Sequence, residues 1–176
     1  MTRKKRILTF LIFVAIFIGA YSIGAAMTVS NEDAMEFLKE FQLAIEGIDA
    51  VGIFTHNASI GLPMFIPGFG MIWGAFTAWS TGFAFSALAT TNPLLESIPP
   101  LSVLLISPFG LMELAAYSIG MSRSMLLIHT IIKKNPLKNE LRPTAIEVGI
   151  VIALLLAGGF IEFIMIQQFD SDFLKP

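Results

Sequence analysis

Glu113 is the residue of this sequence whose chemistry most needs an explanation. It lies in SPFGLMELAAYSIG, residues 107 to 120, where nearly all neighbouring side chains are apolar. A carboxylate in such surroundings could serve as a general acid or base. Placing it inside a membrane costs about 3 kcal/mol or more. We therefore expect either that other polar groups compensate Glu113 or that it lies close to an aqueous interface.

The residues just before Glu113 predict the start of a helix. Ser107 is a favourable N-cap, Pro108 suits the first helical position, and Gly110 permits close packing. Glu113 then falls in the first turn or just beyond it, where the positive end of the helix dipole favours a carboxylate. This helix break explains part of the compensation but supplies no positively charged side chain.

A structural polar site is expected where Glu113 meets a second membrane segment. His56 and Asn57 lie at the start of that segment and are the best-placed partners if Glu113 is near the same surface. Arg123 follows Glu113 by ten residues, which in one straight helix separates them by about 15 Å along the axis. We expect Arg123 to extend its charged end to the cytoplasmic interface instead.

No further catalytic or metal-binding cluster accompanies Glu113. The chain has no cysteine, and its two histidines, His56 and His129, lack a second histidine or cysteine at ligand spacing. The glycines of PGFGMIWG lie in apolar sequence without a lysine, so they do not form a phosphate-binding loop. We expect no metal, no cofactor and no enzymatic activity from this chain alone.

The composition places these residues in a membrane protein. Of the 176 residues, 55% are hydrophobic and only 14% are charged, whereas soluble domains carry about 25% charged residues. The basic residues fall in two clusters and the formal net charge is -2, so nothing favours a nucleic-acid partner. We predict an all-α, polytopic integral membrane helix bundle that forms a single domain over residues 1–176.

Apolar runs of about 20 residues, the length needed to cross a bilayer, divide the bundle into segments. The first run is longer than a usual signal-peptide core, so we expect a retained helix. The next segment has apolar residues at three- and four-residue spacing and an acid-rich opposite face, which predicts an amphipathic outer helix. That helix either binds a partner or packs on its own bundle. The expected segments are five transmembrane ones and this helix: 7–27, 30–49 (amphipathic), 51–67, 70–90, 103–132 and 144–167.

The basic clusters predict the orientation in the membrane. MTRKKR at the N-terminus and KKNPLKNELRP, residues 133 to 143, should both face the cytoplasm, because positively charged loops stay there. The first crossing ends outside the cell and the second cluster is expected inside, so an odd number of crossings must lie between them. The apolar sequence is long enough for three. We expect a cell-membrane protein with a cytoplasmic N-terminus and an extracytoplasmic C-terminus.

Prolines and glycines interrupt the middle of the chain. Pro63 and Pro67 in GLPMFIPGFG free backbone carbonyl groups that neighbouring groups must satisfy. This stretch is either two short crossings that meet near Pro67, or one kinked crossing followed by a re-entrant piece. Gly70 and Gly74 form a G-x-x-x-G pattern, which predicts close packing of helices.

Two motifs together resemble the stage II sporulation protein M family of multi-pass membrane proteins. In IFTHNASIGLPMFIPGFGMIWG an asparagine leads a glycine-punctuated helix, and SPFGLMEL follows at residues 107–114. The second motif of the family is Pro-His-Gly-x-x-Glu-Leu, and this chain has Phe109 in place of the histidine. Proton or metal chemistry is therefore less expected unless His56 has taken over that role. The matching positions are Asn57, Pro108, Gly110, Glu113 and Leu114.

The resemblance implies a membrane component that acts through partners, as in a scaffold that gathers cell-wall-remodelling enzymes, without implying sporulation. Our first hypothesis is a non-enzymatic scaffold or accessory subunit that binds other integral membrane proteins or further copies of itself, with lipids around it. The alternative is a small transporter or channel-like protein with a polar site at broken helices. An intramembrane enzyme using Glu113 as acid or base has the least support, because no second catalytic group is identified.

Overall fold

The chain folds into a bundle of α-helices, and the part of it that the structure describes contains no strand. The structure is a computed structural model that describes residues 3–45 and 47–173. The all-α prediction is confirmed. The elements are α1 (Arg3–Ala25), α2 (Asn31–Ile45), α3 (Ala50–Gly61), the 3₁₀ turn η1 (Leu62–Phe65), α4 (Phe69–Thr91), α5 (Pro93–Glu96), α6 (Pro100–Ile106), α7 (Pro108–Ile132) and α8 (Lys138–Phe173).

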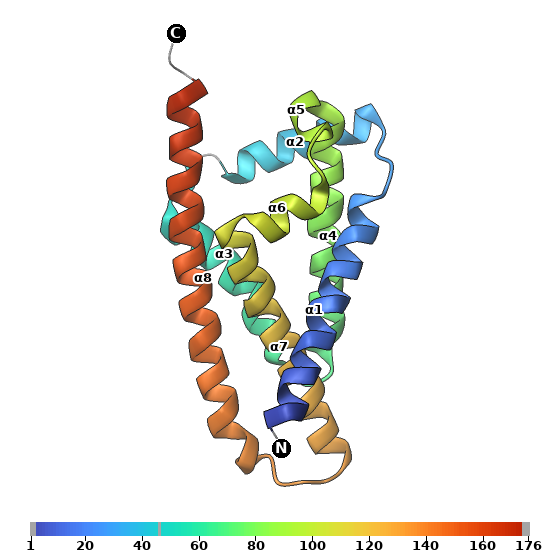
Figure 1. The fold of residues 1–176 in the computed structure, drawn as a ribbon, viewed down its shortest axis with the longest axis vertical. Coiled ribbons are helices and arrows are strands. Elements are labelled where there is room, and N and C mark those ends of the chain that lie inside the picture. Colours follow the sequence, from blue (N-terminus) through green and yellow to red (C-terminus); the bar gives the residue numbers. More distant parts are fainter. Residues whose placement is uncertain (1–2, 46, 174–176) are drawn as a thin grey trace.

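The two ends of the bundle differ in charge. Figure 1 shows that α1 begins at the end where α7 connects to α8, whereas α8 ends at the opposite end. Most lysines and arginines of the chain lie in residues 3–6 and 133–142, so we call this the basic end. Helix α2 lies toward the other end (Figure 1) and carries exposed acidic residues: Glu32, Asp33, Glu36 and Glu40.

Two helices of the described chain are long and apolar enough to cross a membrane, namely α1 and residues Lys138–Gln168 of α8. Helices α6 and α7 form a third candidate span if they are taken together. The molecule is therefore a membrane protein with two or three candidate spans. The five crossings expected from the sequence stay a prediction.

Helices α3 and α4 do not qualify as spans, for different physical reasons. α3 has 12 residues, which makes it roughly 18 Å long against a hydrocarbon layer of about 30 Å. α4 is as long as α1, with 23 residues. Its many threonines, serines, glycines and tryptophans, however, lower its mean hydropathy.

A tight turn separates α3 from α4. η1 follows α3 directly and is buried through Met64 and Phe65. Gly68 then has a φ of 78°, a left-handed conformation that glycine adopts without strain, and α4 begins at the next residue. Gly70 lies so close to the backbone of Met64 that a Cβ would collide with it. The Pro63–Pro67 stretch thus forms a turn packed against the start of α4.

Helix α2 packs on its own bundle. Ser30 caps it, since its Oγ accepts a hydrogen bond from the backbone N–H of Asp33 at 3.1 Å. Ala34 is fully buried with Val29 and Ala87. Phe37 meets Phe83 of α4 edge to face, with ring centroids 6.4 Å apart. The acidic side chains listed above remain exposed on the opposite side of the helix.

Helices α1 and α4 approach closely because each has a glycine at the crossing. A Cβ on Gly24 of α1 would collide with the backbone of Trp79 and Phe83. Reciprocally, a Cβ on Gly82 of α4 would collide with the backbone of Tyr21 and Ala25. Backbones can meet this closely only where side chains are absent, as in other membrane helix pairs.

A row of aromatic rings follows one side of α4. Phe69, Trp73, Phe76, Trp79 and Phe83 form successive ring contacts with centroids 5.7 to 5.9 Å apart. Phe69 and Phe76 are about half exposed, at 48% and 52%. The indole N–H of Trp73 donates to the carbonyl of Ile60 in α3 at 3.0 Å. The row therefore combines exposed apolar surface with a contact that holds α3 on α4.

The crossing of α1 and α4 yields a stability prediction with an internal control. Gly24→Ala should lower the free energy of unfolding by about 2 kcal/mol, because overpacking separates the two backbones. Gly19→Ala, on the same helix but with nothing within 4 Å of the new Cβ, should be neutral or stabilising by up to about 1 kcal/mol through helix propensity. Thermal unfolding of the detergent-solubilised protein, followed by circular dichroism, measures both. Equal midpoints for the two variants would contradict the close crossing.

Candidate functional site

Asn57 and Glu113 form a direct hydrogen bond between two helices. Asn57 lies on α3 and is only 8% exposed. Its Nδ2 donates to Oε1 of Glu113 on α7 at 2.6 Å. Because Asn57 supplies an amide rather than a positive charge, the bond satisfies the carboxylate without forming an ion pair. The structure thus brings together the two motif residues that the sequence analysis had expected to meet.

The break between α6 and α7 positions Glu113. α7 turns by 85° from α6, and Ser107 stands at the corner. Its Oγ accepts from the N–H of Gly110 at 3.1 Å and donates to the carbonyl of Val103 at 2.6 Å. Pro108 occupies the first helical position. The expected helix start is therefore present, and one hydroxyl group both begins α7 and satisfies a carbonyl of α6.

The corner lies within the bundle rather than at one of its ends. Figure 1 shows α6 crossing between the long helices, with α7 running from it toward the basic end. Tyr21 of α1 supports α6, because its hydroxyl donates to the carbonyl of Pro100 at 3.0 Å. Gly110 is buried and lies against the carbonyls of Val103 and Leu104. A side chain at Gly110 would not fit there.

A second carboxylate belongs to this site. Glu162 of α8 is near enough to interact electrostatically with Glu113 and with Tyr117, which lies one helical turn after Glu113. Tyr117 is buried and stacks on Phe17 of α1 with ring centroids 5.8 Å apart. In the described part of the chain neither carboxylate has an ion-pair partner. We call Asn57, Glu113, Tyr117 and Glu162 the polar site, in which a hydrogen bond joins Asn57 to Glu113.

Two adjacent glycines bring α8 close enough to contribute Glu162. Gly158 lies against Phe109 and Met112 at the start of α7. A Cβ placed on Gly158 would be 3.6 to 3.9 Å from atoms of these two residues. Gly159 lies against Ala50, Ile53 and Phe54 of α3 in the same way. Gly158 and Glu162 are four residues apart and thus on one helix face. The three helices that carry the polar site therefore meet where α8 has no side chains.

His56 does not take part in this site. Its side chain is exposed and makes no hydrogen bond in the described structure, and only its backbone carbonyl accepts one, from Ser59 at 2.6 Å. The reason is helical geometry, since adjacent residues point about 100° apart around the axis. With Asn57 facing α7, His56 must face outward. The expected role of His56 as a partner of Glu113 is wrong.

Arg123 also differs from the expectation. Instead of extending to an interface, it is 2% exposed and forms a bidentate pair with Glu147 of α8, with Nε to Oε2 and Nη2 to Oε1 both 2.7 Å. Its Nη1 donates to Glu140 at 2.8 Å. Arg6 of α1 donates to the same Oε1 of Glu147 at 2.7 Å. We call these four residues the arginine–glutamate network.

The network explains why α8 begins before Pro143, and not at residue 144 as expected. The proline removes one backbone hydrogen bond of the helix, in its second turn. Glu140 lies in the first turn of α8 and is held by Arg123. Two arginines and two glutamates balance in charge, and Arg6 also donates to Ser122 at 2.8 Å. Three helices are therefore joined through one neutral cluster.

Gly70 and Gly74 pack helices within this chain. Gly70 meets the backbone of Met64, as described above, and Gly74 meets the side chain of Met121 on α7. Both glycines are buried. The close packing predicted from the G-x-x-x-G pattern is thus observed between α4 and its own neighbours.

The polar site contains two carboxyl groups, one amide and one phenol, from Glu113, Glu162, Asn57 and Tyr117. Within residues 3–45 and 47–173 no group of three or more His, Cys, Asp and Glu side chains could hold a metal ion. Sequence reasoning did not assign Glu162 to the site. The sequence nevertheless contains an indication of this role, because Glu162 is the single charged residue in the apolar run from 148 to 166.

These features define the class of the molecule, an all-α membrane protein with a buried polar site beside an interrupted helix. The sequence model of the Stage II sporulation protein M family matches residues 8–165, and the chain therefore belongs to that family. No curated protein and no solved structure matches it.

Removal of the amide donor tests the polar site. Asn57→Ala leaves Glu113 without its hydrogen bond, and interhelical bonds of this kind contribute about 1 kcal/mol in membrane proteins. We expect a loss of stability of that size in thermal unfolding. His56→Ala is the matched control, because it removes a neighbouring side chain that has no such bond, and it should leave the midpoint unchanged. Equal effects of both variants would contradict the structural role of Asn57.

The arginine–glutamate network should be worth more than the amide bond. Arg123→Met leaves two glutamates against one arginine in a mostly buried cluster, and breaking such clusters costs about 3–5 kcal/mol. We expect a correspondingly large fall in the unfolding midpoint. Lys133→Met removes the same charge from an exposed position nearby and should change stability by less than about 0.5 kcal/mol. A small effect of Arg123→Met would show that water replaces its partners.

Proposed function

We propose that this protein is a non-enzymatic membrane scaffold or accessory subunit, which acts by binding other integral membrane proteins. The observation that carries the proposal is that its buried charged and amide groups form bonds between helices. Asn57, Arg6 and Arg123 are bonded to glutamates of other helices. Such bonds hold helices in place, which is a structural use of polar groups.

The acidic side of α2 is the surface best suited to a partner. α2 uses Ala34 and Phe37 to pack on the bundle, and four acidic side chains remain exposed: Glu32, Asp33, Glu36 and Glu40. Charged side chains of this kind speed and orient association with a basic partner. We infer a cytoplasmic basic end and an extracytoplasmic α2 from the positive-inside rule, so the partner would present a basic outer surface.

Co-purification tests this function. The tagged full chain, extracted from its native cells in a mild detergent, should bring down other membrane proteins in a constant ratio. Glu36→Lys together with Glu40→Lys should reduce that recovery several-fold, because like charges then face the basic partner. Lys133→Glu together with Lys134→Glu makes a charge change of equal size at the other end and should have no effect. Recovery of the wild-type chain alone, as a homo-oligomer, would contradict the proposal.

A small transporter or channel-like protein is the second candidate. Glu113 and Glu162 favour it, because two carboxylates without an ion-pair partner in the described chain are typical of sites that exchange protons or cations in membranes. The two functions differ in the outcome for one variant. In liposomes a transporter would carry a flux that Glu113→Gln abolishes, whereas Glu113→Gln keeps the acceptor for Asn57 and should leave a scaffold assembled.

A further inference from the structure

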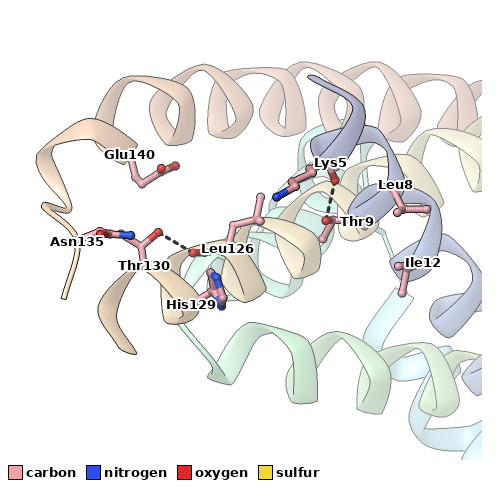
Figure 2. Close-up of a pocket in the computed structure, with 9 residues that line it drawn as sticks. All are labelled: Lys5, Leu8, Thr9, Ile12, Leu126, His129, Thr130, Asn135 and Glu140. Carbon is pink, nitrogen blue, oxygen red and sulfur yellow. Dashed lines mark hydrogen bonds between the residues drawn. The ribbon is translucent and has the colours of Figure 1, made fainter. Parts of the chain in front are cut away.

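A cavity of about 700 Å³ lies at the basic end, between α1, the end of α7 and the beginning of α8. Figure 2 shows side chains from all three helices and from the α7–α8 connection around it. It is separate from the polar site, since none of Asn57, Glu113, Tyr117 and Glu162 lines it. Its size falls within the range of pockets that hold small ligands.

The walls of this cavity have two kinds of chemistry. Leu8, Ile12 and Leu126 form an apolar side. Leu8 and Ile12 are 60% and 48% exposed and belong to α1, a candidate membrane span. Lys5, His129 and Asn135 form a polar side closer to the end of the bundle. An occupant should therefore combine a polar head with an apolar chain.

The polar side has unused donors, namely the Lys5 ammonium group and the His129 ring. Among the described residues Lys5 and His129 make no ion pair or side-chain hydrogen bond. Glu140 also lines the cavity, but its Oε2 accepts from Arg123 at 2.8 Å. The hydroxyl groups of Thr9 and Thr130 donate to carbonyls of their own helices at 2.8 and 2.9 Å. Because the Lys5 ammonium group has no partner within the described part of the chain, the cavity favours an occupant with a negatively charged group.

The surroundings strengthen that preference. Six more basic side chains lie exposed at the same end of the bundle: Arg3, Lys4, Lys133, Lys134, Lys138 and Arg142. Clusters of this kind beside a membrane helix attract anionic lipids to the surface around it. A soluble phosphate would satisfy the lysine but would leave the exposed Leu8 and Ile12 uncovered.

We propose that this cavity binds one anionic phospholipid, with its phosphate at Lys5 and His129 and an acyl chain along Leu8 and Ile12. The site is selective because the headgroup meets unpaired donors while the chain continues the lipid-facing surface of α1. Binding would tie the start of α1 to the α7–α8 connection. The arginine–glutamate network joins the same helices beside the cavity, since Arg6 follows Lys5 directly and Glu140 belongs to both.

Native mass spectrometry of the detergent-solubilised full chain tests the proposal, with phosphatidylglycerol and phosphatidylcholine as probes. One phosphatidylglycerol should bind at least fivefold more tightly than phosphatidylcholine. Lys5→Gln should weaken phosphatidylglycerol about fivefold, the effect of 1 kcal/mol. Lys134→Gln removes the same charge outside the cavity and should change the affinity by less than twofold. Thermal unfolding of both variants checks that they are folded.

Two further arms separate the sources of the signal. Leu8→Gln should weaken phosphatidylglycerol binding while leaving the unfolding midpoint unchanged, because Leu8 is exposed. Glycerol phosphate in millimolar excess should not displace the lipid. If Lys5→Gln and Lys134→Gln lowered the phosphatidylglycerol affinity equally, the binding would come from diffuse surface charge, and the proposed site would be overturned. Complete displacement by glycerol phosphate, or equal binding of both lipids, would also overturn it.

Discussion

The absence of water from a bilayer is the constraint on which this structure depends. A polar group that enters the hydrocarbon layer must find its partner within the protein. Helix α7, which with α6 forms a candidate span, carries two buried polar groups, Glu113 near its start and Arg123 ten residues later, and each is bonded to another helix. Glu113 joins α7 to α3, and Arg123 joins it to α8. The position and tilt of α7 are thus set at two levels by bonds to other helices.

Close backbone approach is what allows these bonds to form. Asn57, Glu113 and Glu162 stand on three different helices, and those helices meet where α8 presents Gly158 and Gly159. A Cβ on Gly159 would come within 3.1 Å of the backbone of Phe54, so a larger residue there would press α8 away from α3. The membrane supplies little hydrophobic drive for helix association, so small residues and polar bonds must provide it. The same residues therefore shape the bundle and create its polar site.

Local rules predicted the parts of this structure that local chemistry controls. The start of α7 at Ser107 and Pro108 follows from capping, which depends on four consecutive residues. The pairing of Asn57 with Glu113 could be expected because each is polar within an apolar run. The direction of His56 required knowledge of which face of α3 meets α7, and the adjacent residue then points elsewhere.

Contacts between distant segments explain what the sequence did not reveal. The burial of Arg123 depends on Glu140 and Glu147, and Glu140 is in place only because α8 begins before Pro143. A proline ordinarily marks a helix boundary, so the local rule pointed the wrong way. Here an ion pair between residues 17 apart in the sequence outweighs one missing backbone bond.

The row of rings on α4 gives the molecule a built-in optical reporter. The sequence contains two tryptophans, and both lie in that row. Trp73 is bonded to the carbonyl of Ile60, and the backbone of Trp79 meets Gly24. Intrinsic indole emission therefore originates entirely from one helix, at the points where α3 and α1 contact it. A shift in its wavelength on adding lipid or another protein would register movement of those two contacts, with no label attached to the chain.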